Sequence, residues 1–103
     1  MLVSGVGKAD PALTNKTQRR STSRDAAILD ARARLLDYLK RIMLPSGASI
    51  GERATEDEDW RKKLEASAAG IEVAETRWDD GDAAVVTLRV ERSAISRALE
   101  LGE

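Results

Sequence analysis

The chain has 103 residues, of which 42% are hydrophobic and 34% are charged, with a formal net charge of −1. This balance is typical of one globular domain over residues 1–103 and excludes a disordered chain. The chain has no Cys and no His, which excludes disulfides and thiolate metal sites and removes the commonest general base at neutral pH. We therefore expect no enzyme activity, no catalytic residue, no metal and no cofactor.

The charge and the hydropathy of the chain also bear on its partners. A net charge near zero argues against nucleic acid as the partner. No apolar run approaches the roughly 20 residues that a bilayer span requires. The start, MLVSGVGKAD, lacks the basic and apolar regions of a signal peptide. We expect contact with a membrane only through an anchor outside this chain, and a precursor signal is not visible in it.

The first element that the sequence predicts is a short strand. Leu2, Val3 and Val6 form an apolar run that ends before Asp10 and Pro11. The segment GVGK, residues 5–8, has only a fragment of a phosphate-binding loop, because the Walker spacing and the Ser or Thr after Lys are missing. We expect no phosphate site there.

A long amphipathic helix follows. Asn15 is its expected N-cap, with Gln18 completing a capping box, and nothing breaks the helix until about Leu44, before Pro45 and Gly47. The spacing predicts a buried stripe that Leu36 and Met43 widen and that comprises Ile28, Ala31, Leu35, Leu39 and Ile42. Its first turns, KTQRRSTSR, are polar all round, so we expect this end to project into solvent or to fray.

A shorter second helix is predicted over residues 55–70, TEDEDWRKKLEASAAG. Thr55 or Asp57 is the candidate cap, Trp60 and Leu64 face the core, and the preceding Ile50 lies in a turn-rich connection. The acidic residues 56–59 sit at the helix start, where the macrodipole favours negative charge, and we prefer this interpretation to a metal site.

The last predicted elements are a β-hairpin in the segment of residues 70–92 and a helical turn or two over 92–103. Asp80 and Gly81 give the turn signal. In the register that buries the apolar side chains, the pairs are Ile71–Val90, Glu72–Arg89, Val73–Leu88 and Glu75–Val86. The acidic run DDGD, residues 79–82, is interpreted as a solvated turn and not as a calcium loop.

Together these elements predict an α+β fold. We expect two layers, with the long N-terminal helix packed on a small antiparallel sheet that contains the C-terminal β-hairpin. Whether the first strand joins the same sheet as the hairpin is left open by the sequence.

Two candidate interaction surfaces stand out. The basic side chains at the start of the long helix, Arg19, Arg20 and Arg24 together with Lys16, either bind an anionic partner or simply solvate that face. The second surface is an exposed hairpin face around Thr76, Trp78 and Val85, on which Trp78 is the anchor. The alternative is that the first strand or the last helix covers Trp78.

The run GVGKADPALTNKTQRRSTSRDAAILDARARLLDYLKRI resembles the opening of the LPP-twenty type outer-membrane lipoprotein family and of the N-terminal domain of flagellar assembly protein T. The residues that carry the resemblance are Gly5, Gly7, Asn15, Gln18, Ala26, Ala27, Ile28, Asp30, Ala31, Leu35 and Leu36. The later segment AVVTLRV is similar as well. The resemblance implies a non-enzymatic domain of the periplasm or outer membrane that binds proteins of the cell envelope or of the flagellum.

The sequence is also compatible with a second function. The chain could instead be a homo-oligomeric structural subunit that assembles into a ring or polymer without a separate ligand, through an unpaired hairpin edge and a protruding helix.

Overall fold

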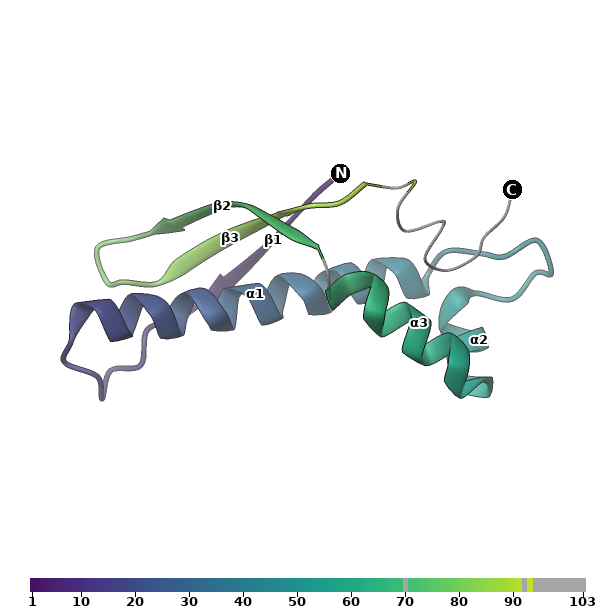
Figure 1. The fold of residues 1–103 in the computed structure, drawn as a ribbon, viewed down its shortest axis with the longest axis horizontal. Coiled ribbons are helices and arrows are strands. Elements are labelled where there is room, and N and C mark those ends of the chain that lie inside the picture. The colour runs from purple at the N-terminus through teal and green to yellow at the C-terminus, as the bar shows by residue number, and fades with distance from the viewer. Residues whose placement is uncertain (70, 92, 94–103) are drawn as a thin grey trace.

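A computed structural model describes residues 1–69, 71–91 and 93 of the chain. The elements follow in the order β1 (Leu2–Gly7), α1 (Lys16–Lys40), α2 (Ile50–Glu56), α3 (Glu58–Ala69), β2 (Glu72–Trp78) and β3 (Ala84–Arg89) (Figure 1). The predicted α+β class is confirmed, because α1 packs along an antiparallel sheet formed by the three strands. The helical turns expected over 92–103 lie outside the described residues, apart from Ser93.

The sheet has the strand order β1-β3-β2, so the first strand does join the hairpin in one sheet. β3 is the central strand, and β1 and β2 are both antiparallel to it. The predicted pairs Glu72–Arg89 and Val73–Leu88 are confirmed. The predicted pair between Glu75 and Val86 is wrong, because the register shifts between Val73 and Glu75 and brings Glu75 opposite Thr87. The extra residue at this bulge is Ala74.

Helix α1 begins as expected and ends sooner. The Asn15 side chain accepts a hydrogen bond from the backbone N–H of Gln18 at 3.2 Å. The helix ends at Lys40 and not near Leu44. The residues after it form a compact turn, in which the N–H of Leu44 donates to the carbonyl of Ala48 at 2.8 Å, so the backbone of this segment is already paired outside the helix.

The expected second helix is in fact two helices, and the expected connection around Ile50 was wrong. Ser49 caps α2, its hydroxyl accepting from the N–H of Glu52, so Ile50 is the first residue of a helix and is fully buried. Asp57 interrupts the helical path with an extended backbone (φ −130°, ψ 113°), and its carboxylate accepts from the N–H of Asp59, the second residue of α3. Gly70, expected to end the helix, lies outside the described residues.

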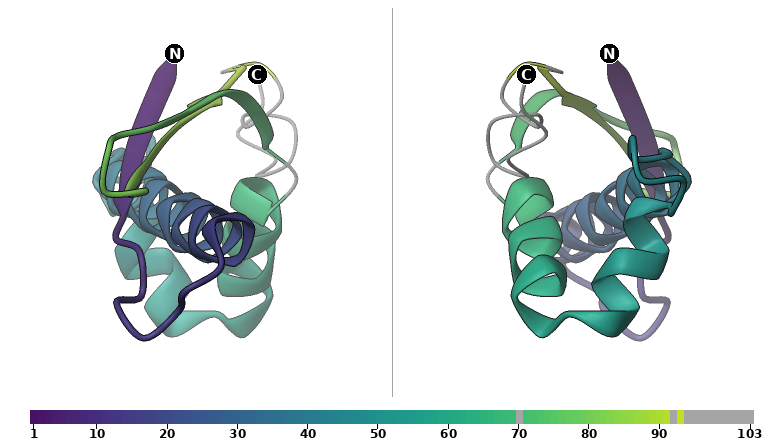
Figure 2. Two further views of the ribbon diagram at one scale, coloured as in Figure 1. Left: turned by 90° about the vertical axis from the view of Figure 1, so that its left-hand side faces the viewer. Right: turned by 90° about the vertical axis from the view of Figure 1, so that its right-hand side faces the viewer.

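The face of α1 that is buried changes gradually along the helix, because its buried residues are spaced by four positions. Ala31, Leu35 and Leu39 are buried as predicted, whereas Ile28, Leu36 and Ile42 are only half-buried. The prediction for Met43 is wrong, because α1 ends at Lys40 and Met43 is 61% exposed. One core cluster joins Ala27 and Ala31 to Ala84, Val86 and Leu88 of β3. A second cluster, at the other end, comprises Leu35, Leu39, Ile50, Ala54, Leu64, Ala68 and Val90. The sheet thus lies on one side of α1, and α2 and α3 flank its C-terminal half on the other side (Figure 2).

Strand β1 packs unusually close to α1 because it presents two glycines to the helix. A Cβ atom at Gly5 would lie 2.3 Å from the backbone nitrogen of Ala31. A Cβ atom at Gly7 would lie 2.5 Å from the backbone nitrogen of Ala27. The segment GVGK therefore serves close strand-to-helix packing, for which a residue without a side chain is required.

Candidate functional site

The hairpin tip is fastened to the start of α1 by four side chains, which we call the tip clamp: Arg19, Arg20, Trp78 and Asp82. The Asp82 carboxylate lies 3.0 Å from Nε of Arg20 and 3.3 Å from Nε of Arg19. The indole Nε1 of Trp78 donates to the backbone carbonyl of Arg20 at 3.0 Å. The guanidinium of Arg20 also lies over the Trp78 ring, 5.4 Å from its centroid.

The clamp favours the charged form of the Asp82 carboxylate. The hydrogen bond from Arg20 lowers the pKa of Asp82 below its ordinary value of 3.8, and the positive charges of Lys16, Arg20 and Arg19 act in the same direction, while burial opposes them. Asp82 also has a left-handed backbone (φ 65°), a conformation that Asp tolerates better than most residues. Asp82 is therefore held in place by its ion pairs at the end of the hairpin.

The tip clamp corrects two expectations. The polar first turns of α1 neither project nor fray, because Arg19 and Arg20 are half-buried against the hairpin. The DDGD segment does form the hairpin turn, in which Asp79 accepts from the N–H of Gly81 at 2.9 Å. It is not fully solvated, because the Asp82 side chain is only 10% exposed.

The predicted hairpin surface does not exist as one face. Residues directly opposite each other on paired strands point to the same side of a sheet. Thr76 lies opposite Val86 and Trp78 opposite Ala84, both of which are buried against α1, whereas Val85 points to the other side. The bulge at Ala74 causes the difference, since one extra residue turns the rest of β2 over.

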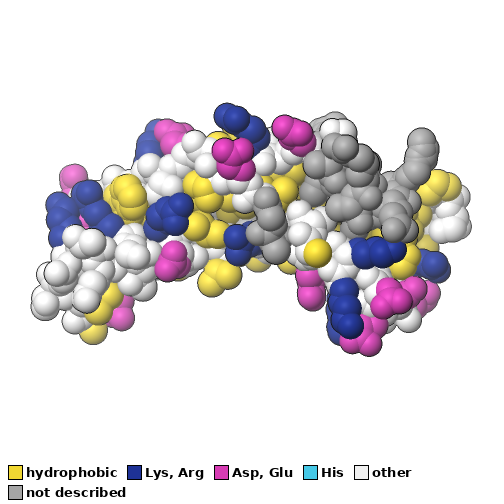
Figure 3. Space-filling model, viewed as in Figure 1, with side chains coloured by type: hydrophobic (Ala, Val, Ile, Leu, Met, Phe, Trp, Pro, Cys, Tyr) yellow, Lys and Arg dark blue, Asp and Glu magenta, His cyan; other side chains and the backbone are white. Residues whose placement is uncertain are grey.

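Trp78 is covered on one side by α1 and not by the first strand, which lies across the sheet beyond β3. It stays 37% exposed at the rim of the clamp. Arg24, the third basic residue of the predicted surface, is half-buried one turn further along α1. Basic side chains gather at the end of the molecule where the hairpin tip meets α1 (Figure 3). Two of the basic residues there, Arg19 and Arg20, form ion pairs with Asp82 within the tip clamp.

A different apolar surface lies on the side of the sheet that faces away from α1. We call it the outer sheet face; its apolar members are Leu2, Val6 and Val85, with exposed fractions of 65%, 52% and 38%. Val6 and Val85 lie opposite each other on β1 and β3. Leu2 and Val6 were not predicted as surface residues, although their alternation with Gly5 and Gly7 is the period-two signal of a strand with two different faces.

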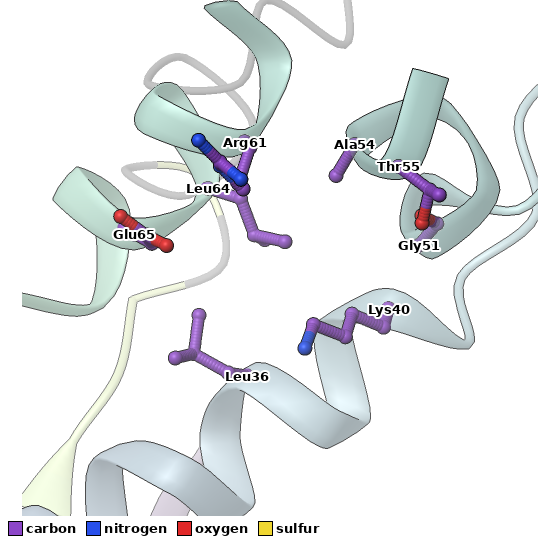
Figure 4. A pocket seen from close by; sticks show the side chains of 8 residues that line it. All are labelled: Leu36, Lys40, Gly51, Ala54, Thr55, Arg61, Leu64 and Glu65. Carbon is purple, nitrogen blue, oxygen red and sulfur yellow. The ribbon is translucent and has the colours of Figure 1, made fainter. Parts of the chain in front are cut away.

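The third feature is a cleft of about 340 Å³ between α1, α2 and α3. Leu36, Ala54 and Leu64 point into it from the three helices (Figure 4). The other lining residues are Lys40, Gly51, Thr55, Arg61 and Glu65. No local pattern in the sequence predicts this cleft, because the cleft depends on the break between α2 and α3 at Asp57.

Among residues 1–69, 71–91 and 93 there is no group of three or more acidic side chains that could hold a metal ion. The buried hydroxyls of Ser23 and Ser67 each donate to a backbone carbonyl of their own helix. No helix in the described part combines the length and the apolar composition that crossing a membrane requires.

Comparison with known proteins gives no match to any family model, to any curated protein or to any solved structure.

Proposed function

We propose that this chain is a non-enzymatic protein-interaction domain of the cell envelope. It would act in the periplasm, or at the outer membrane through an anchor outside this chain, as part of a lipoprotein or of a flagellum-associated protein. The proposed location rests on the resemblance of residues 5–42 described above. The proposed activity rests on one observation, the exposed apolar side chains of the outer sheet face.

The outer sheet face has the character of a binding surface. Three apolar side chains lie on two neighbouring strands that no described helix covers. The charges beside them are matched within the chain: Glu72 lies opposite Arg89, and Glu75 lies 3.5 Å from Arg77. A surface that is apolar and locally neutral suits a partner with a similarly uncharged interface, because the centres of protein interfaces are depleted of charge.

Affinity capture from crosslinked cells tests this proposal. The wild-type chain is compared with the double variant Val6→Ser/Val85→Ser, and with Met43→Ser, which removes an exposed apolar side chain far from the sheet. We expect envelope proteins to be captured by the wild type and by Met43→Ser and to be lost from the double variant, with circular dichroism showing all three folded. Capture of cytoplasmic proteins or nucleic acid, or an identical set from all three chains, would contradict the proposal.

The alternative is a self-assembling structural subunit, and the observation that favours it is the outer edge of β2, which pairs with no other described strand. Two features oppose assembly through the sheet edges. On β1, the outward N–H of Val6 is already taken by the Asp30 carboxylate at 2.8 Å, and on β2 the bulge at Ala74 interrupts the edge. Light scattering over a wide concentration range separates the two functions. The average molecular mass of a self-assembling subunit rises with protein concentration, whereas a domain that captures other proteins stays monomeric.

A further inference from the structure

We infer that the cleft between α1, α2 and α3 binds an amphipathic helix of a partner protein, with an acidic side chain of that helix between Lys40 and Arg61. The inference rests on the proposed function, since it assumes that the chain binds proteins. It concerns a second surface, on the opposite side of α1 from the sheet.

The cleft has the size and lining of a site for apolar anchor side chains. Leu36 forms its floor, and Ala54 and Leu64 stand on the two walls (Figure 4). Leu64 and Ala54 are buried, and Leu36 is half-buried, so the apolar surface lies at the bottom of the cleft. A volume of about 340 Å³ is enough for side chains of a docked segment but not for a whole helix, which would lie across its mouth.

The apolar surface continues out of the cleft along α1. Leu29, Ala33 and Leu36 are spaced by four and three residues, which places them on one face of the helix. Leu29 is 65% exposed and Ala33 is exposed. This row matches the spacing of anchors that pair two helices in groove docking. A small ligand in the cleft would leave Leu29 uncovered, whereas a helix laid along α1 would cover the row and fill the cleft.

The charges at the cleft favour an acidic partner. Lys40 of α1 and Arg61 of α3 are cationic, and Glu65 is the one acidic side chain in the lining. The stem of Lys40 packs beside Gly51, whose added Cβ would lie 3.0 Å from the Cβ of Lys40. Arg61 forms an ion pair of 3.4 Å with Glu58, but both side chains are more than half exposed, so this pair exchanges readily for another carboxylate.

A displayed library of helical peptides about 20 residues long tests the inference without knowledge of the natural partner. Peptides selected on the wild-type chain are expected to share a row of apolar residues at positions i, i+3 or i+4, and i+7, with an acidic residue at one end. Affinities of the selected peptides are then measured by fluorescence anisotropy against single and double variants.

The variant Lys40→Glu/Arg61→Glu is expected to weaken peptide binding about tenfold. Each exposed ion pair with the acidic side chain of the peptide contributes a few-fold to the affinity, and the variant turns both attractions into repulsions. Leu29→Ser is expected to weaken binding at least fivefold. Lys62→Glu changes the same charge on α3 outside the cleft lining, and it should leave the affinity within about twofold. All four substituted positions are exposed, so circular dichroism should show that the variants are folded.

Selection of no helical peptide, selection of basic peptides, or equal affinity for the wild type and the charge-reversed variant would overturn the inference. The results that would contradict the proposed function are different ones. If peptides fail to bind while the wild-type chain still captures envelope proteins through Val6 and Val85, only the cleft inference falls.

Discussion

Replacing Gly5 by Ala tests whether the spacing between β1 and α1 depends on the absence of a side chain. The added methyl group would lie 2.3 Å from the backbone nitrogen of Ala31 and 2.4 Å from the carbonyl oxygen of Ala27. Both contacts are with backbone, which cannot rotate away, so strand and helix must separate by about 1 Å to restore ordinary contact.

The expected cost follows from two opposing effects. Overpacking of a rigid contact costs about 3 kcal/mol, while replacing Gly by Ala in a regular element recovers up to about 1 kcal/mol of backbone entropy. We expect a net loss of about 2 kcal/mol in the free energy of unfolding, which lowers the Tm of a domain of this size by about 10–15 °C. Thermal and urea unfolding followed by circular dichroism measure both quantities.

Gly81→Ala is the matched control. A Cβ atom at Gly81 would lie 3.5 Å from the nearest atom, the Asp79 carboxylate, so we expect a change within about 0.5 kcal/mol. If Gly5→Ala is as stable as the wild type, or more stable, the close approach of β1 to α1 does not require glycine and the reasoning is wrong.

Three further predictions concern the hairpin and the sheet edge. The pKa of Asp82 is lowered in the folded chain, so the ionised carboxylate stabilises the fold above its ordinary pKa of 3.8. This stabilisation is lost as the pH falls through the lower pKa of the folded state. The difference in unfolding free energy between the wild type and Asp82→Asn should therefore narrow below about pH 4. Asp30→Ala should expose the N–H of Val6, seen as faster hydrogen exchange at that amide and as concentration-dependent association by light scattering, whereas Asp37→Ala on the same helix should show neither effect. Trp78→Ser removes a hydrogen bond and a cation–π contact, each worth about 1 kcal/mol, so hydrogen exchange at the hairpin tip should rise while the domain stays folded; unchanged exchange would mean that the tip is held without the indole.

Local patterns predicted the elements that depend on neighbouring residues. The cap at Asn15, the buried Leu35 and Leu39, and the pairing of Glu72 with Arg89 follow from spacing and alternation, and the structure bears them out. Ala74 has no property that distinguishes a bulge from a regular strand residue. The sequence therefore predicted the start of β2 correctly and placed Thr76 on the wrong side.

Features that join distant residues escaped prediction for a different reason. Arg20 and Asp82 are 62 positions apart, and only the length of the hairpin brings its tip to the start of α1. The two glycines of β1 lie opposite small residues of α1, Ala27 and Ala31. That match of small residues across a strand–helix contact was present in the sequence, but it becomes visible only once the two elements are known to touch.

The position of β3 in the sheet has a consequence for how this chain folds as it is made. β3 is the central strand and is also the last strand among the residues that the structure describes. Its neighbour β1 is the first of the described elements. The N–H of Val90 donates a hydrogen bond to the carbonyl of Met1, and the terminal amino group of Met1 donates one to the carbonyl of Val90, across 89 positions of the sequence. Because β1 and β2 do not pair with each other, no part of the sheet that includes β1 can form until residues 84–89 have been synthesised. Such long-range pairing slows folding, and a chain arrested before β3 would present the apolar stripe of α1 to chaperones and proteases.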